Sequence, residues 1–195
     1  MLDKSVPYYN ILMCRPGNLD VPHYDLPEGF RFSLYEEGNE KDWAEIEWSV
    51  GEYPRRVDAL AKFQSKYFYP HELKRRCVFI ENSKSEKIAT ATIWWEYSGV
   101  RRDPWVSYVA VKPEYQGQGL SKCLISRILE MSEEIEGKRD VYLHTQTWSH
   151  VAVRLYKKFG FYITREPNLY KYPNDEWEQA EALLEEIYRG YPKDR

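Results

Sequence analysis

A strand, a glycine-containing turn and a helix follow one another within residues 105–136, and this segment constrains the fold most strongly. The run Val109-Ala110-Val111 ends the strand, and Gly117-Gln118-Gly119 opens a stretch in which apolar residues recur every three to four positions. Gly137 is a residue type that commonly ends a helix. A further apolar strand is predicted at 141–147. A strand joined by a helix to a neighbouring strand runs parallel to it.

The segments on either side predict further strands and helices. The runs 77–81 and 87–97 flank a polar turn and predict an antiparallel hairpin. A parallel connection beside an antiparallel hairpin predicts a mixed sheet of the α/β or α+β class. Other strands are predicted at 8–15, 30–35 and 161–165, and helices at about 39–53, 55–75, 119–136, 149–159 and 175–189.

Length and composition favour a single domain. The chain has 195 residues, and its 7 Trp, 17 Tyr and 7 Phe supply a large core despite a mean hydropathy of -0.71. No repeat or Gly/Ser-rich linker divides it. We therefore expect one domain, with a core at 30–165, an N-terminal extension at 1–29 and a C-terminal strand and helix extension at 166–195.

Charge, cysteine usage and hydropathy exclude several classes of protein. A net charge of -3 without a basic block argues against nucleic acid as a partner. Cys14, Cys77 and Cys123 are widely spaced and lack a Cys-x-x-Cys pair, which argues against disulfides and a metal site. Apolar runs such as 11–14 are far shorter than the roughly 20 residues that span a bilayer. We expect no membrane contact and a cytoplasmic location.

The glycine turn is predicted to bind an anion. Glycine lets backbone amides point into one concavity, and the start of a helix adds a partial positive charge, so residues 116–121 suit a phosphate. The sequence lacks the Gly-Lys-Ser/Thr of a P-loop, and Lys122 stands where a dinucleotide fingerprint needs its third glycine. An ordinary tight turn is the alternative interpretation.

Two motifs flank the long helix and the strand after it. The first is Gln116-Gly117-Gln118-Gly119-Leu120-Ser121, and the second is Ser149-x-x-Ala152-x-x-Leu155-Tyr156-x-x-Phe159-Gly160-Phe161. They resemble Gln/Arg-x-x-Gly-x-Gly/Ala and Asn-x-x-Ala-x-x-Leu-Tyr-x-x-x-Gly-Phe, the signatures of the GNAT superfamily of N-acetyltransferases. Ser121 replaces the final Gly/Ala and Ser149 the usual Asn. Both replacements are small, and Ser149 retains an oxygen able to cap the helix.

The resemblance implies a fold, a reaction and a set of binding residues. The fold would be a central mixed, mostly antiparallel sheet with a splayed parallel pair and helices on both faces. The protein would be an acyltransferase that moves an acetyl group from acetyl-CoA to a primary amine by direct attack, without a metal. Val109 N–H would polarise the thioester carbonyl. The residues implied to contact acetyl-CoA are Val109, Ala110, Val111, Gln116, Gly117, Gln118, Gly119, Leu120, Ser121, Ser149 and Ala152.

Tyr156 is implied to be the general acid. A phenol, with an ordinary pKa of about 10, can protonate a thiolate as the C–S bond breaks. Tyr156 lies seven residues after Ser149 and on the same helix face as Ala152. The alternative is a tyrosine packed at the boundary of helix and sheet, with its hydroxyl hydrogen-bonded.

The sequence leaves the general base open. Glu96, His144 and Glu81 are candidates on predicted strands, and a water chain is a further alternative. His150 is expected to point elsewhere. Cys123 falls on the apolar stripe of its helix and is expected to be a core residue rather than a nucleophile.

The acidic segment around the first predicted helix favours a cationic acceptor. Residues 36–52 hold seven acidic residues and one lysine, a local charge of -6. Trp48 could stack on an ammonium group, or the helix could simply be a solvated acidic face with Trp48 under a loop. Trp94, Trp95 and Tyr108 are further candidates for the acceptor pocket. Because strand residues alternate faces, Trp94 and Trp95 cannot both point into it.

Two readings other than an active enzyme remain open. Ser121, Ser149 and the unidentified base are compatible with an inactive acyl-CoA-binding or sensing module on the same fold. The apolar face of the last predicted helix, with Trp177 and Leu184, is compatible with a protein-interaction domain. We expect a monomer or a homodimer.

Overall fold

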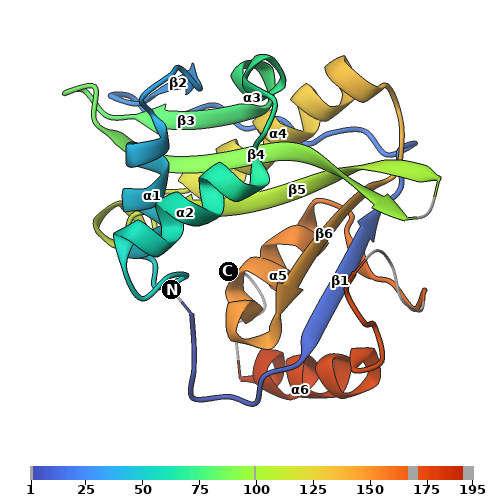
Figure 1. Cartoon of the computed structure of the whole chain (residues 1–195). Helices are drawn as coiled ribbons and strands as arrows, with labels where there is room; N and C mark the ends of the chain where they lie inside the picture. Colours follow the sequence, from blue (N-terminus) through green and yellow to red (C-terminus); the bar gives the residue numbers. More distant parts are fainter. Residues whose placement is uncertain (1, 99, 167–170, 191–195) are drawn as a thin grey trace. The chain divides into compact units, whose positions relative to one another are not determined.

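A computed structural model of the chain describes residues 2–98, 100–166 and 171–190 (Figure 1). The parts of the predicted C-terminal extension at 167–170 and 191–195 lie outside the described residues. The chain forms two compact units. Unit 1 comprises residue 2 and residues 20–94 and 106–138; unit 2 comprises residues 3–19, 95–105 and the described residues from 139 onward.

The described residues contain seven strands in the order β2-β3-β4-β5-β6-β1-β7, and six α-helices. The sheet is mostly antiparallel with one parallel pair, as predicted. The strands are β1 (Asn10–Arg15), β2 (Arg31–Leu34), β3 (Cys77–Glu81), β4 (Lys87–Ser98), β5 (Arg101–Val111), β6 (Val141–Gln146) and β7 (Tyr162–Ile163). The helices are α1 (Glu40–Ser49), α2 (Arg56–Lys66), α3 (Pro70–Arg76), α4 (Leu120–Glu136), α5 (His150–Lys158) and α6 (Trp177–Arg189), with short 3-10 turns η1 (Pro113–Tyr115) and η2 (Thr147–Ser149).

Unit 1 is built on the antiparallel hairpin of β3 and β4. The strands pair from Cys77 opposite Thr92 to Ile80 opposite Ala89, and β2 pairs antiparallel to β3. Every residue of β3 is buried, because helices α1 and α2 lie on one face of this part of the sheet and α4 on the other (Figure 1). The hairpin predicted from the sequence is confirmed.

A buried ion pair connects α3 to the end of α4. The Arg76 side chain is only 1% exposed, and its guanidinium donates to Glu72 and to Glu136, each at 2.7 Å. Helix α4 buries Leu120, Leu124 and the rest of its predicted stripe apart from Ile135, which is half-buried. The helix ends at Gly137, as predicted.

Unit 2 contains β6, β1 and β7 in antiparallel pairs, with helices α5 and α6. The buried Arg15 of β1 donates from Nε to the carbonyl of Phe159 at 2.8 Å and from a terminal nitrogen to the carbonyl of Leu19 at 2.9 Å. In α6, Ala180 and Leu184 are fully buried. The centre of the apolar face therefore packs within its own unit, whereas Trp177 at the start of the helix is half-buried.

Four predicted boundaries are wrong. The helix expected at 39–53 ends at Ser49, shortly before Gly51 adopts a left-handed φ of 83°. The helix expected at 55–75 is two helices, because Tyr67 leaves the helical conformation and Pro70 starts α3. Strand β5 begins at Arg101, earlier than predicted, because an ion pair with Asp103 at 2.5 Å accommodates the charge of Arg101 in a strand. Strand β7 has only two residues. Among the described residues, no helix is both long enough and apolar enough to cross a lipid bilayer.

Candidate active site

The residues predicted to form the site lie on both units, and each group is described within its own unit. Unit 1 holds β5 from Val106 to Val111 and the loop 116–121 that opens α4. Unit 2 holds Glu96, His144, Ser149, Ala152 and Tyr156.

The loop of unit 1 has the geometry of an anion-binding turn. Gly117 and Gly119 have φ angles of 80° and 82°, and an added Cβ on either would meet no described atom within 4 Å. The loop is exposed from Gln116 to Gly119. Within the described chain no side chain caps α4, and the first turn carries no acidic residue. Open amides at the start of a 17-residue helix fit the diphosphate of coenzyme A.

The side chain of Gln116 holds this loop to the strand before it. Its Nε2 donates to the carbonyl oxygen of Val111 at 2.9 Å. The start of η1 is tied to the sheet by Lys112, whose N–H donates to the carbonyl of Ile88 at 2.9 Å. The turn is therefore fixed at the strand that enters it, which reduces the entropy that an anion would otherwise have to overcome on binding.

Tyr108 distorts strand β5 at the residue before the predicted oxyanion donor. Its φ angle is 55°, and Ser85 is the only other described non-glycine residue with a positive φ. Five consecutive buried residues, 103–107, precede the half-buried Tyr108 and Val109, so the burial of the strand changes at this point. A left-handed residue within a strand is typical of a β-bulge and costs roughly 1–2 kcal/mol. The distortion changes the direction of the Val109 N–H relative to a regular strand.

Packing on both sides of Tyr108 maintains this conformation. Its ring lies 4.8 Å from that of Trp43, and its hydroxyl oxygen lies 3.0 Å from that of Tyr53. Burial, followed by the hydrogen bond with Tyr53, raises the pKa of Tyr108 far above its ordinary value. The sequence carries no signal for this feature, because tyrosine is not a residue type that favours positive φ.

In unit 2 the second motif, residues 149–161, spans the whole of α5 and the turn that follows it. Tyr156 is only 8% exposed, and its ring meets that of Phe161 edge-on at 5.7 Å. Ala152 lies one turn earlier on the same face and is half-buried. The expectation that Ser149 caps the helix is wrong for the described residues. Ser149 stands at the N-cap position, but its hydroxyl accepts a hydrogen bond from Gln146 at 3.3 Å instead.

Glu81 is a poor candidate for the general base. Its carboxylate pairs with Arg31 at 2.6 Å and with Lys87 at 3.0 Å in unit 1. Burial alone would raise the pKa of Glu81, but the hydrogen bonds from Lys87 and Arg31 outweigh it and the net pKa lies below the ordinary value. A carboxylate held in this way is a structural ion pair.

His144 and Glu96 are brought together around Tyr172. The imidazole of His144 stacks on the ring of Tyr172 at 4.1 Å and 13°. Burial, then the charge of Glu96, raises the pKa of Tyr172 to about 12. Tyr172 could not be identified from the sequence, because it belongs to neither motif.

Asn10 of β1 orients the imidazole of His144. The Asn10 Nδ2 donates to the carboxylate of Glu176 at 3.1 Å, which directs its Oδ1 toward His144 Nε2, 3.1 Å away. A carboxylate only accepts hydrogen bonds, so the amide orientation is fixed and Nε2 of His144 carries the hydrogen. Nδ1 is then the nitrogen of neutral His144 with an acceptor lone pair.

Cys123 and His150 make contacts that are typical of structural residues. The thiol of Cys123 donates to the carbonyl of Asp25 at 3.2 Å, and burial raises the pKa of Cys123, so the thiolate is disfavoured. His150 is buried, with Nε2 3.1 Å from a carboxylate oxygen of Asp3. In the described part of the chain, no group of three or more His, Cys, Asp or Glu side chains is placed to hold a metal ion.

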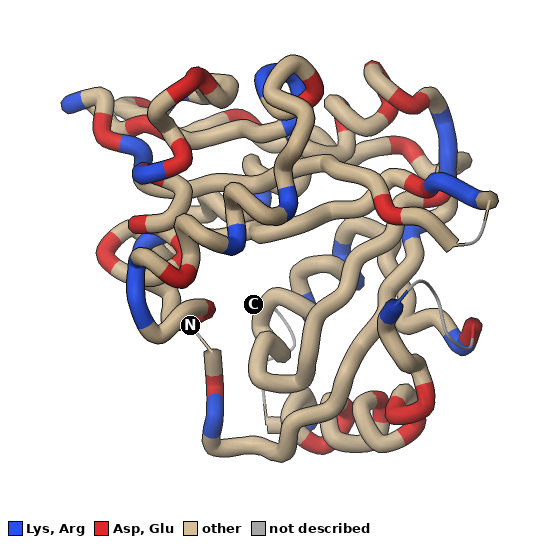
Figure 2. Tube along the Cα trace, in the orientation of Figure 1, with Lys and Arg blue, Asp and Glu red and all other residues tan. Residues whose placement is uncertain are grey.

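The acidic segment before α2 is partly neutralised. Figure 2 shows Lys and Arg interspersed with Asp and Glu around α1 and α2. Arg56 pairs with Glu45 at 2.6 Å and lies 5.5 Å from the ring of the exposed Trp48. Trp48 thus already contacts a cation of the chain itself.

Trp94 packs against Tyr67 in unit 1, at 4.9 Å, whereas Trp95 belongs to unit 2.

Comparison with known proteins identifies the family. Residues 36–161 match the Acetyltransferase (GNAT) family. Because this match covers well over half of the chain, the protein belongs to that family.

Two curated relatives are N-acetyltransferases by name. One is a spermidine N(1)-acetyltransferase of Vibrio cholerae serotype O1, 28% identical over 53% of this chain and 58% of its own length. The other, from Bacillus subtilis (strain 168), is provisionally named a [ribosomal protein bS18]-alanine N-acetyltransferase, and is 38% identical over 31% of this chain and 40% of its own length. The chain therefore spans about half the length of the curated relatives that it matches.

Solved structures support the fold. A GCN5-related N-acetyltransferase from Sphaerobacter thermophilus superposes with a TM-score of 0.63 at 19% identity, over 80% of this chain and 48% of the other. One from Kribbella flavida gives a TM-score of 0.52 at 20% identity, over 80% of this chain and 56% of the other. At these identities the likeness concerns the fold alone.

Proposed function

We propose that the protein transfers an acetyl group from acetyl-CoA to a primary amine. The observation that supports this most strongly is the exposed glycine loop at the uncapped start of α4, in a chain of the GNAT family. The loop amides from Gln116 to Ser121 would bind the diphosphate, and the backbone of Val109, Ala110 and Val111 would bind the pantetheine arm. Ser149 and Ala152 would complete the cofactor site. No resident metal is needed.

The roles of the reacting groups follow from their chemistry. Bound acetyl-CoA supplies the acetyl thioester. Val109 N–H would donate to the carbonyl oxygen, where negative charge develops as the amine nitrogen attacks. Tyr156 would give its phenolic proton to the departing sulfur, so that a neutral thiol leaves.

His144 or Glu96 would take the proton that the amine loses on attack. His144 is the stronger candidate, because Asn10 orients its imidazole with a lone pair on Nδ1. Both side chains lie near Tyr172 in unit 2. We propose them as alternatives for one role and not as a pair that acts together.

The acceptor is proposed to be a cationic amine. The relatives are named for spermidine and for the alanine of a ribosomal protein, which both present an amine. The acidic segment 36–52 favours a positively charged acceptor. We retain a monomer or a homodimer as the proposed assembly.

Binding calorimetry combined with thiol release tests the proposal. Acetyl-CoA should bind saturably, and one thiol should be released per acetyl group transferred to spermidine, an aminoglycoside, an amino acid or an N-terminal alanine peptide. Binding without thiol release from any amine would favour an inactive acyl-CoA-binding module. Absence of binding would exclude both. A protein-interaction role would have to use the half-buried Trp177 of α6, because Leu184 at the centre of the apolar face is buried in unit 2.

A further inference from the structure

Glu47 of α1 is a buried acidic side chain, and one of its oxygens lacks a hydrogen-bond partner among the described residues. The residue is 3% exposed, and its Oε1 has no hydrogen-bond partner in the part of the chain that the structure describes. Other acidic residues of the helix, such as Glu40, Asp42 and Glu45, are half-buried. A buried carboxyl oxygen without a hydrogen bond costs roughly 1–3 kcal/mol even in the neutral acid, so its presence requires an explanation beyond folding.

The surroundings of Glu47 are aromatic side chains of unit 1. The ring of Trp43, one turn earlier on α1, lies 4.8 Å from Tyr108, 5.2 Å from Phe63 and 6.3 Å from Tyr67. We call the following residues the aromatic box: Trp43, Tyr53, Phe63, Tyr67, Trp94 and Tyr108. The charge of Glu47 contributes to raising the pKa values of Tyr67 and Tyr108, which places its carboxylate beside the box.

Further polar atoms of this cluster also lack partners. Trp43 Nε1, Tyr67 Oη and Thr92 Oγ1 are buried, and none makes a well-formed hydrogen bond within the described residues. Native interiors leave few such groups, and several beside one carboxylate are unusual. Donors and acceptors that are unsatisfied in one cluster are typical of a site that a polar ligand completes.

We propose that Glu47 and the aromatic box bind the ammonium group of the acceptor amine. A carboxylate and ring faces are the two groups that recognise an ammonium ion most directly. One ring of the box already has such a neighbour, because Lys66 Nζ lies 5.5 Å from the centre of Tyr108. This inference rests on the proposed acetyl transfer and names its acceptor class as alkylammonium compounds.

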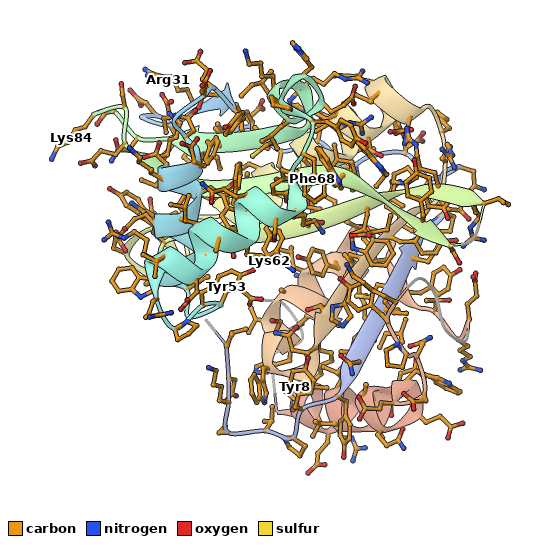
Figure 3. All side chains as sticks on the ribbon, in the orientation of Figure 1. Tyr8, Arg31, Tyr53, Lys62, Phe68 and Lys84 are labelled. Atoms are coloured by element: carbon orange, nitrogen blue, oxygen red, sulfur yellow. The ribbon has the colours of Figure 1, made fainter. Side chains whose placement is uncertain are left out.

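The box adjoins the proposed oxyanion donor along the chain. Tyr108 belongs to the box and directly precedes Val109, so both are set by the same distortion of β5. Tyr53 and Tyr108 are half-buried, and their hydroxyls lie 3.0 Å apart. Tyr53 lies in the segment between α1 and α2 (Figure 3).

Ammonium binding should release a proton. Burial, then the charge of Glu52, raises the pKa of Glu47 well above its ordinary value, which favours the protonated side chain when no ligand is bound. A bound cation favours the carboxylate and lowers this pKa. The titratable and charged groups around Glu47 are Glu52, Tyr53, Lys66, Tyr67, Cys77 and Tyr108. Apart from Glu52, these groups are three phenols, a thiol and a lysine, and their ordinary pKa values lie well above 7.

Calorimetry of the full chain without acetyl-CoA tests the inference. The probe is 1,4-diaminobutane, with the uncharged 1,4-butanediol as its matched control. We expect a clear preference for the diamine. At pH 7, titrations in buffers of different ionisation enthalpy should show up to one proton released per diamine bound. No preference for the diamine, or binding without proton release, overturns the proposal.

Two matched variants locate the effect. Glu47→Gln should weaken diamine binding about 10- to 100-fold and abolish proton release, since a charge-assisted hydrogen bond is lost. Glu37→Gln removes an exposed carboxylate of the same acidic segment and should bind like the wild type. The role of Glu47 is refuted if Glu47→Gln binds the diamine as tightly as the wild type, or if Glu37→Gln loses as much affinity as Glu47→Gln. If Glu47→Gln does not fold, the proton count of the wild type still decides.

The enzymatic readout separates this inference from the proposed function. Glu47→Gln should raise KM for the diamine while the affinity for acetyl-CoA stays unchanged. Acetyl transfer with an unchanged KM would overturn the role of Glu47 and leave the proposed function intact. A wild-type chain that binds diamine and releases a proton, yet takes up no acetyl-CoA, would overturn the proposed function and leave the ammonium site.

Discussion

Replacing Gly119 by alanine tests whether the loop conformation supports cofactor binding. Gly119 has a φ of 82°, and the structure shows no described atom within 4 Å of an added Cβ. The substitution therefore introduces backbone strain without a steric clash. A left-handed L-residue costs about 1–2 kcal/mol. For a chain of this size, that corresponds to a decrease in Tm of about 2–8 °C.

Gly119→Ala should also weaken the binding of acetyl-CoA by the loop amides. If the backbone relaxes toward negative φ, at least one amide turns away from the diphosphate. A hydrogen bond to a charged group contributes about 1.5–3 kcal/mol, which corresponds to a loss of acetyl-CoA affinity of about 10- to 100-fold. Urea unfolding and calorimetry with acetyl-CoA measure the two effects separately.

Gly29→Ala is the matched control. Gly29 has a φ of 87°, and no described atom lies within 4 Å of its added Cβ. It should lose a similar free energy of unfolding and keep its affinity for acetyl-CoA. The reasoning is refuted if a folded Gly119→Ala binds acetyl-CoA as tightly as the wild type, or if Gly29→Ala loses the same affinity.

Three further predictions concern the acid, the buried ion pair and pH. Tyr156→Phe should lower kcat about 100- to 10,000-fold with unchanged acetyl-CoA affinity; calorimetry and steady-state kinetics check this, and equal turnover would exclude Tyr156 as the acid. Glu136→Ala leaves Arg76 with only one of its two carboxylates and should lower the free energy of unfolding by up to about 3–5 kcal/mol, measured by urea unfolding; a loss below 1 kcal/mol would show that Glu72 alone suffices. The hydrogen bond from Arg76 holds the pKa of Glu72 below its ordinary value. The stabilisation by Glu72 is therefore present above the unfolded pKa of about 4.3 and is lost as pH falls through the folded pKa. Glu72→Gln should reduce the dependence of the free energy of unfolding on pH in this range, as measured by urea unfolding at several pH values. An unchanged pH dependence would contradict the assignment.

The sequence predicts the order of the elements well because local patterns determine it. The hairpin at 77–97 and the helix at 119–136 have periodicities and end signals that tertiary contacts do not override. The break between α2 and α3 was missed, although Pro70 marks it, because apolar residues continue through the segment. Strand β5 is longer than predicted, and its early part holds Asp103, which pairs with the distant Arg139 at 3.2 Å as well as with Arg101. The contact with Arg139 cannot be seen without the fold.

The candidate site could be predicted only where it lies on a motif. The loop 116–121 was identified because glycine spacing reports backbone conformation directly. Glu81 and His144 looked alike in sequence, yet one is held by two cations and the other is oriented by Asn10. Asn10 and Glu176 are far from His144 along the chain, so no local pattern connects them. The burial of Glu47 was equally invisible within a run of acidic residues.

Unit 1 keeps three features that folding alone would not favour. Tyr108 has a left-handed backbone, and one buried oxygen of Glu47 lacks a hydrogen-bond partner within the described residues. In the same part of the chain, the amides that open α4 lack a side-chain cap. Each could be removed by one substitution, to glycine, to an apolar residue or to a capping residue. Costly local features that occur in one unit are typical of a functional site. The strained strand, the buried carboxylate and the open helix start would then correspond to the carbonyl, the amine and the diphosphate of one reaction.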